Sequence, residues 1–154
     1  MRILLVLLTT LCFGRVHAQH SSSLQKRWKV ISIADKGMCY NFKRDSVAFS
    51  PEFSSPMDKE KARELIAALV GVAGEGIFVF GKDGHYEVLH DTKQDGIGSY
   101  TVSNKDRIIT ANVVRNGVKA TEKMKFYIKE KLLHFTLVSD APTPKMVLER
   151  LPQK

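Results

Sequence analysis

Glu122 is the residue with the clearest potential for chemistry, because it interrupts a row of apolar side chains. It lies in segment 118–129, where small or apolar residues alternate with lysines and polar residues. This period of two is typical of a β-strand with one buried face. Glu122 falls on the apolar row, so the strand either bulges to release it to solvent or points it inward. An inward carboxylate is costly unless a hydrogen-bond donor or water pairs with it.

The other residues that could do chemistry form no recognisable site. The sequence contains no nucleophile elbow and no phosphate-binding loop, and His85, His90 and His134 lack the spacing of metal ligands. Cys39 is the one cysteine after residue 18, so an internal disulfide is excluded. A lone cysteine is more often a small buried hydrophobe than a nucleophile. The sequence therefore predicts no enzyme, no metal site and no cofactor.

Two tight turns predict the register around Glu122. Asn116-Gly117 is typical of a two-residue type I′ turn, and Glu130-Lys131 is predicted to form a second tight turn. Two-residue loops fix the register of the strands that they join. The predicted pairs are Arg115–Val118, Val113–Ala120, Ala111–Glu122, Ile109–Met124, Ile128–Leu133, Phe126–Phe135 and Met124–Leu137. The same face is apolar in all three strands, which indicates an antiparallel meander.

Further strands are predicted on both sides of this meander. They cover residues 28–33, 38–42, 77–80, 85–89, 100–102 and 146–151. The hairpins predict the pairs Phe80–Tyr86, Phe78–Val88, Tyr100–Ala111 and Val102–Ile109. Residues 44–54 are predicted to be irregular, and residues 91–96 to form a turn-rich loop.

One helix is predicted between the early strands. Ser55 is a suitable N-cap, Pro56 suits the first helical position, and Gly71 follows the last apolar residue. The whole pattern predicts a mainly β fold, an antiparallel up-and-down meander that closes into a barrel of about eight strands. The alternative is a two-layer α+β fold in which the helix packs on an open sheet.

The N-terminus has the features of a secretory signal peptide. Arg2 precedes an apolar run over 3–13, and Val16-His17-Ala18 provides a small-residue end. We therefore expect a cleaved signal over 1–18, a flexible lead-in over 19–26 and a barrel domain over 27–154. The expected location is secreted or periplasmic. The apolar run is too short to span a bilayer, so an integral membrane protein is not expected.

The net charge is basic but carries little functional information. The chain has 24 Lys and Arg against 16 Asp and Glu, and loss of Arg2 and Arg15 with the signal lowers the net charge from +8 to +6. The lysines of 119–129 fall on the outward face of the predicted strand, where lysine discourages edge aggregation. Few aromatic residues accompany them, so nucleic acid is not an expected partner.

Several short motifs resemble the small secreted lipocalin-like domains of bacteria, which have a calycin-type barrel. The motifs are Trp28 near the start of the first strand, Phe78-x-Phe80-x-x-Asp83-Gly84-x-Tyr86, Ser99-Tyr100-Thr101-Val102 with Arg107-Ile108-Ile109-Thr110, and Leu148-Glu149-Arg150-Leu151. The resemblance implies a structural pair in which Arg150 packs on Trp28 at the end of the barrel. It also implies a carrier that holds a small apolar molecule.

The sequence supports a specific hypothesis for such a ligand. Glu122 and Tyr100 would orient its polar head, and Phe78, Met124 and Phe126 would contact its apolar tail. The alternative is an interaction or inhibitor module with a solid core, which binds a macromolecule through loops Phe49–Ser55 and His90–Ile97.

Overall fold

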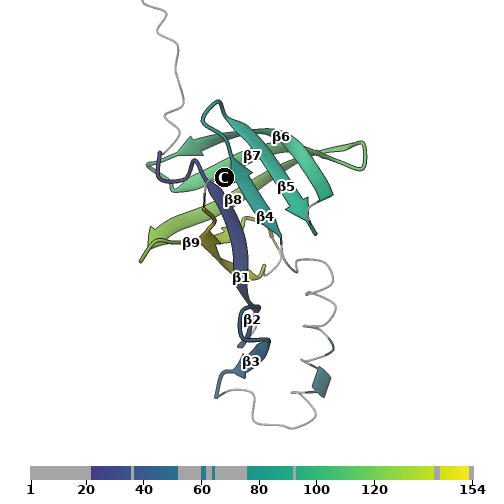
Figure 1. Cartoon of the computed structure of the whole chain (residues 1–154), viewed down its shortest axis with the longest axis vertical. Coiled ribbons are helices and arrows are strands. Elements are labelled where there is room, and N and C mark those ends of the chain that lie inside the picture. Colours follow the sequence, from purple (N-terminus) through teal and green to yellow (C-terminus); the bar gives the residue numbers. More distant parts are fainter. Residues whose placement is uncertain are drawn as a thin grey trace, which may run out of the picture.

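The chain forms a ten-stranded antiparallel sheet, and eight of its strands close into a barrel (Figure 1). The computed structural model describes residues 22–35, 37–51, 60, 61, 64, 76–91, 93–140 and 143–152. The strands are β1 (Arg27–Asp35), β2 (Met38–Asn41), β3 (Ser46–Phe49), β4 (Ile77–Phe80), β5 (His85–His90), β6 (Lys93–Ser103), β7 (Ile108–Arg115), β8 (Val118–Lys129), β9 (Leu132–Leu137) and β10 (Lys145–Arg150).

β1 closes the barrel because both of its edges are paired. Arg27 to Lys29 pair with β4 on one side, and Trp28 to Ala34 pair with β10 on the other. Strands β4 to β10 follow one another in sequence order around the barrel. Closure removes the unpaired edges that an open sheet would expose. The mainly β, closed barrel predicted from the alternation is confirmed, and the open α+β alternative is excluded.

The predicted register of the central meander is confirmed. Arg115 pairs with Val118 across a turn in which Asn116 and Gly117 both have positive φ, 49° and 78°, as a type I′ turn requires. Every other pair predicted for β7–β8 and β8–β9 is present, and no register shift interrupts β7 and β8 around Glu122. The bulge that could have released this carboxylate to solvent is therefore absent.

The remaining hairpins also follow the predicted register. Phe80 pairs with Tyr86 and Phe78 with Val88, and β6 pairs with β7 through Tyr100–Ala111 and Val102–Ile109. The predicted terminal strand corresponds to β10, with both bounds one residue earlier.

Two segments predicted to be irregular belong to strands. Residues 46–49 form β3, which pairs with β2, and residues 93–96 form the start of β6. Both segments contain residues of low β-propensity, namely Ala and Ser in the first and Gly, Gln and Asp in the second. Hydrogen bonding to a neighbouring strand outweighs the low β-propensity of these residues. A local sequence pattern does not reveal which segment will be the neighbouring strand.

Other predicted segments fall mostly outside the described residues. The helix predicted from Ser55 to Gly71 has only residues 60, 61 and 64 within them, and it stays a prediction. The predicted signal peptide over 1–18 lies wholly outside. Within the described ranges, no helix is long and apolar enough to cross a membrane.

Aromatic side chains fill one end of the barrel. Phe80 contacts Tyr86 and Tyr100 with ring centroids 5.4 Å and 5.1 Å apart, and all three rings are buried. Leu24 is also fully buried, and its carbonyl accepts a hydrogen bond from Trp28 Nε1 at 3.0 Å. The barrel core therefore begins within the predicted lead-in 19–26.

Trp28 and Arg150, the predicted structural pair, are direct partners across β1 and β10. Trp28 is buried, whereas Arg150 is exposed at the last position of its strand. The register makes the two residues neighbours in the sheet, and the packing of the Arg150 cation on the Trp28 ring stays a prediction.

The β2–β3 hairpin lies beyond the barrel, as a continuation of the second half of β1 (Figure 1). It has its own small apolar cluster, in which Tyr40, Val47 and Phe49 pack against the buried Met38. This cluster is separate from the main core.

Candidate functional site

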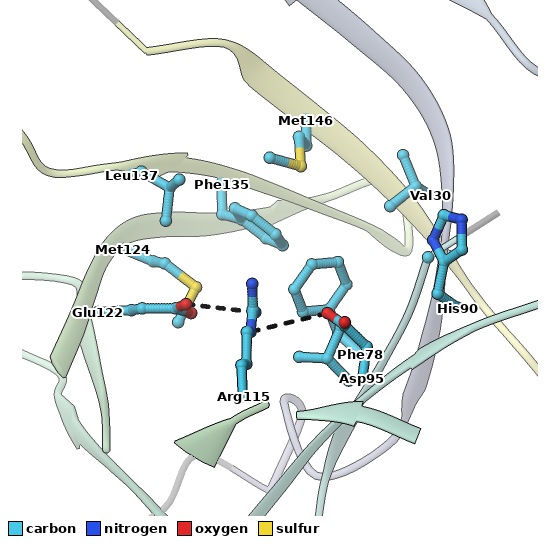
Figure 2. Close-up of a pocket in the computed structure, with 12 residues that line it drawn as sticks. Val30, Phe78, His90, Asp95, Arg115, Glu122, Met124, Phe135, Leu137 and Met146 are labelled. Carbon is cyan, nitrogen blue, oxygen red and sulfur yellow. Dashed lines mark ion pairs between the residues drawn. The ribbon is translucent and has the colours of Figure 1, made fainter. Parts of the chain in front are cut away.

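A cavity of about 210 Å³ lies inside the barrel, and Figure 2 shows side chains that line it. Its walls come from all eight barrel strands, together with the buried Gly76 before β4. The residues that line it are Val30, Gly76, Phe78, Val88, His90, Asp95, Arg115, Glu122, Met124, Phe135, Leu137 and Met146. The lining is mostly apolar, with a small set of charged groups on one side.

Arg115 lies between two carboxylates in this cavity (Figure 2). Its Nη2 atom is 3.2 Å from Glu122 Oε1, and its Nε atom is 3.8 Å from Asp95 Oδ2. The side chain of Glu122 is 21% exposed, Arg115 36% and Asp95 42%. Asp95 is therefore the most exposed of the three side chains, and Glu122 is the least exposed.

The strand register explains why Arg115 and Glu122 face each other. Val113 and Ala111 are buried inward residues of β7, and two-residue alternation from Val113 puts Arg115 on the same face. Glu122 pairs directly with Ala111. Because alanine is small, the space next to it accommodates both the carboxylate and the guanidinium.

Asp95 reaches the cavity because β6 contains a bulge. Val88 pairs with Gly96 and Leu89 with Gln94, which leaves Asp95 as the extra residue between them. A bulge bends its strand and redirects a side chain that strict alternation would send to the other face. Strict alternation from Tyr100 sends Asp95 outward, so the bulge is what places its carboxylate beside Arg115.

Gly96 provides room for the Arg115 side chain. A Cβ atom at this position would lie 3.1 Å from both Cγ and Nε of Arg115, and 2.8 Å from Val113 Cγ2. A side chain here would therefore press on the arginine as it crosses β6. The absence of a side chain at Gly96 allows the guanidinium to lie over the strand.

Tyr86 connects the charged groups to the aromatic end of the barrel. Its hydroxyl donates to Glu122 Oε2 at 3.5 Å, a long hydrogen bond. Burial raises the pKa of Tyr86 well above its ordinary value, and the nearby Glu122 carboxylate raises it further, whereas Arg115 lowers it. Tyr86 therefore remains a neutral donor beside Glu122.

The Arg115 Nε–H group is buried without a hydrogen-bond acceptor in the part of the chain that the structure describes. Asp95 Oδ2, at 3.8 Å, is too distant to accept a hydrogen bond from it. A buried donor without an acceptor is unfavourable, so this Nε–H group lowers the stability of the arrangement.

The predicted ligand residues are brought together only in part. Phe78, Glu122 and Met124 line the cavity. Phe126 lines a different depression, together with Ala34 and Arg107.

Tyr100 lies outside the cavity lining, in the aromatic end. Its hydroxyl donates to the Gly81 carbonyl at 2.9 Å, and burial followed by the charge of Asp83 raises its pKa to about 12. The donor to Glu122 is Tyr86, on β5, although the predicted Tyr100–Ala111 pair is present.

Sequence reasoning missed Arg115, Asp95 and Tyr86 as site residues. Arg115 was detectable, because it lies on the predicted inward row four residues after Ala111. Tyr86 was predicted only as the strand partner of Phe80. No sequence pattern indicates that Asp95 faces the cavity, since its orientation depends on the bulge in β6.

The described residues contain no group of three His, Cys, Asp or Glu side chains that could hold a metal ion. His90 lines the cavity, and its Nε2 lies 3.8 Å from Asp91 Oδ2. The groups in the cavity can donate, accept and carry charge.

Comparisons with known proteins give one structural similarity. No family model matches the chain, and no curated protein matches it. Among solved structures, the chain is similar to the crystal structure of a DUF4847 family protein from Bacteroides vulgatus ATCC 8482, with 16% identity and a TM-score of 0.47. That match covers 86% of this chain and 97% of the other.

Proposed function

We propose that the protein is a secreted, non-enzymatic binding protein that holds a small apolar or amphipathic molecule in the barrel cavity. The observation that carries the proposal is the combination of apolar walls with three charged side chains on one side. Ligand sites commonly join an apolar lining to a few placed polar groups. The apolar run and small-residue end of the N-terminus support secretion.

The cavity volume limits the size of the ligand. An engineered apolar cavity of about 150 Å³ binds benzene, whereas drug-sized ligands need roughly 300–1,000 Å³. At about 210 Å³, this cavity suits a small aromatic molecule or a short alkyl chain. A long-chain lipid could insert only its end.

Two aromatic rings form the best-defined part of the apolar wall. Phe78 and Phe135 contact each other edge to face, with centroids 5.0 Å apart. Leu137 and Met146 are partly buried and pack against the same core. A ligand tail placed against these four side chains would remove their remaining apolar surface from water, which is favourable in proportion to the area buried.

Titration with toluene tests the proposal, because toluene has no head group and reports on the apolar cavity alone. We expect saturable binding by the wild type, measured by ligand-observed NMR. Val88→Phe fills the cavity with a larger side chain and is expected to weaken binding at least tenfold, a loss of about 1.4 kcal/mol. Val114→Phe makes the same substitution on the exposed outer face of β7 and is expected to bind as the wild type does.

Absence of saturable toluene binding by the wild type would overturn the proposal. Equal binding by wild type and Val88→Phe would locate the site elsewhere and would also overturn it. Circular dichroism of each variant establishes that the barrel is intact before binding is compared.

A second candidate function is protein recognition, and the β2–β3 hairpin is the observation that favours it. This hairpin extends beyond the barrel and has a separate apolar cluster around Met38. The proposed recognition loop His90–Ile97 is mostly part of β5 and β6, and Asp95 within it faces the cavity. The hairpin is thus the better-supported recognition element.

A further inference from the structure

A second hollow, of about 650 Å³, lies on the outer face of the barrel. Its lining comes from β1, β2, β8, β9 and β10 and from the turn before β7. We propose that this hollow binds a small amphipathic anion, in which an apolar ring or chain carries one anionic group. The hollow is separate from the barrel cavity, so the inference does not depend on the proposed function.

The strand register places the hollow outside the barrel. Residues that pair directly across antiparallel strands share one face of the sheet. Two parallel outer rows line the hollow over β8, β9, β10 and β1, namely Lys125–Thr136–Lys145–Ala34 and Tyr127–His134–Val147–Ser32. Phe126, Phe135 and Met146 pair between these rows and belong to the barrel core, so alternation turns their main chain toward the hollow. The hollow is therefore a groove between two rows of side chains.

Short side chains in the two rows create the space. The outer face of a barrel is convex, so a depression forms only where short side chains are surrounded by longer ones. Thr136 and Ala34 are the short members of one row, and Val147 and Ser32 are those of the other. At about 650 Å³, the hollow falls within the range of roughly 300–1,000 Å³ that is usual for small-molecule sites.

The charged groups of the hollow favour an anion. Arg107, Lys125 and Lys145 line it, against the single carboxylate of Asp106. The three cations are exposed, and none of them forms an ion pair with another residue in the part of the chain that the structure describes. Asp106 accepts a hydrogen bond from Ser103 Oγ at 2.7 Å. The uncompensated positive charge attracts an anionic group.

The register also shows where the anionic group lies. Lys125 and Lys145 belong to the same row on β8 and β10, with Thr136 of β9 between them. Two strand spacings separate the two lysine backbones, which is roughly 10 Å. Lysine side chains are long and flexible, so both ammonium groups can reach one anion above Thr136. Two charge-assisted hydrogen bonds would then hold that anion.

The second row provides an apolar wall for the rest of the ligand. The rings of Tyr127 and His134 are stacked, with centroids 4.5 Å apart and planes 6° apart, and Tyr127 is 48% exposed. Val147 continues this row on β10. An apolar ring or chain placed against these side chains removes their exposed surface from water. An inorganic anion would gain only the charge interaction, so the site suits an amphipathic anion better.

The test uses two fluorescent probes that have the same aromatic rings. 8-Anilinonaphthalene-1-sulfonate carries an anionic sulfonate, and N-phenyl-1-naphthylamine lacks it. The fluorescence of both probes rises when they leave water for apolar surroundings. We expect the wild type to bind the sulfonate saturably and roughly tenfold more tightly than the neutral probe, because only the sulfonate reaches the lysines.

A pair of matched double variants locates the site. Lys125→Gln with Lys145→Gln removes both ammonium groups and is expected to weaken sulfonate binding roughly tenfold, with binding of the neutral probe unchanged. Lys119→Gln with Lys129→Gln removes the same charge from the same face of β8, away from the hollow. At physiological salt, which screens distant charges, this control should bind the sulfonate within about twofold of the wild type.

A third variant tests the space independently of charge. Thr136→Phe places a large side chain between the two lysines, and phenylalanine is well suited to a strand. We expect roughly tenfold weaker sulfonate binding, since the ring fills the position of the anionic group. Circular dichroism shows that the barrel is intact. In proton NMR spectra of the wild type, the sulfonate should shift the ring resonances of His134 and leave those of His85 unchanged.

Several outcomes would overturn the inference. They are absence of saturable sulfonate binding, equal affinities for the two probes, equal weakening in the two double variants, and wild-type binding by Thr136→Phe. Poly-L-glutamate represents the alternative occupant, an extended acidic polymer. If it displaced the sulfonate at equal molar concentration, the small-anion assignment would also be wrong. Toluene binding in the barrel cavity is measured separately, so each of these results leaves the proposed function standing.

Discussion

The two ends of the barrel interior are built from the same alternating strands but have opposite character. At one end, Phe80, Tyr86 and Tyr100 fill the space between strands with three buried aromatic rings. At the other end, Arg115 and Glu122 stand in a cavity of about 210 Å³. Alternation places a residue inward at both ends, so the size and charge of each inward residue produce the difference.

Small residues at the open end provide the space. Ala111 is the partner of Glu122, and Gly96 lies beneath the Arg115 side chain. Protein interiors are normally packed as densely as organic crystals, so a run of small inward residues leaves volume unless larger neighbours fill it. Charged side chains can occupy such volume only when they pair and retain access to solvent.

Tyr86 lies at the boundary between the two ends. Its ring belongs to the aromatic cluster, and its hydroxyl donates to Glu122. The aromatic end therefore supplies a donor to the charged end without exposing a polar group of its own. A phenylalanine here would fill the same space but would leave the carboxylate with one donor fewer.

The largest expected difference between the ends is in packing energy. Phe80→Ala removes a side chain that is 1% exposed, and we expect unfolding free energy to fall by about 3–5 kcal/mol. Phe78→Ala makes the same substitution in the wall of the cavity, where the ring is partly buried. There we expect a loss of roughly 1–2 kcal/mol, because less apolar surface is lost and a cavity already exists.

Chemical denaturation of both variants and the wild type measures these values. The two substitutions are matched in residue type and lie two positions apart on β4. Equal losses would show that the open end is packed as tightly as the closed end, and would contradict the comparison.

A smaller effect is expected when the charges of the open end are unbalanced. Arg115→Met keeps the length and apolar stem of the side chain but removes the guanidinium, leaving Asp95 and Glu122 without their shared partner. The side chains are partly exposed, so we expect a loss of up to about 1 kcal/mol. Added salt should reduce the difference from wild type, because it screens the repulsion between carboxylates. A loss that did not change with salt would indicate a packing effect instead.

Much of the fold was predictable because tight turns and alternation act locally. Asn116-Gly117 predicts its own turn, and the turn then fixes all pairs of β7 with β8. The closure of the barrel was also predictable in outline, since many short strands with one apolar face need a closed sheet. The strand at 93–96 was not, because its polar residues and its single glycine have low β-propensity and are held by pairing with β5.

The candidate site was predictable only where it follows alternation. Glu122, Met124 and Phe78 line the cavity as expected from their inward rows. The tyrosine that donates to Glu122 was not predictable, because the choice between Tyr86 and Tyr100 depends on how far each strand is displaced along the barrel axis. The position of Asp95 depends on the bulge in β6, and no local pattern in this sequence predicts that bulge.

The last expected effect is a change in the alkaline dependence of stability, and it distinguishes the closed end. Burial raises the pKa of Tyr100 from its ordinary value of 10.0 to about 12 in the folded protein. The raised pKa of the Tyr100 hydroxyl means that its contribution to the free energy of unfolding is complete below pH 10.0, where both the folded and the unfolded state hold the proton. This contribution is lost as the pH rises to about 12. In that window the unfolded state gives up its proton first, so unfolding becomes easier. Tyr100→Phe has no proton to lose there, and its unfolding free energy should fall less steeply than that of the wild type.

Near neutral pH the same variant should be less stable by about 1 kcal/mol, because the hydrogen bond to the Gly81 carbonyl is lost. Chemical denaturation of both proteins is measured across the alkaline range. The lysines also titrate there, but they are the same in both proteins, so the difference between the two curves reports the contribution of Tyr100. Parallel curves would show that the Tyr100 hydroxyl titrates as freely as in the unfolded chain, and that this end of the barrel is open to water.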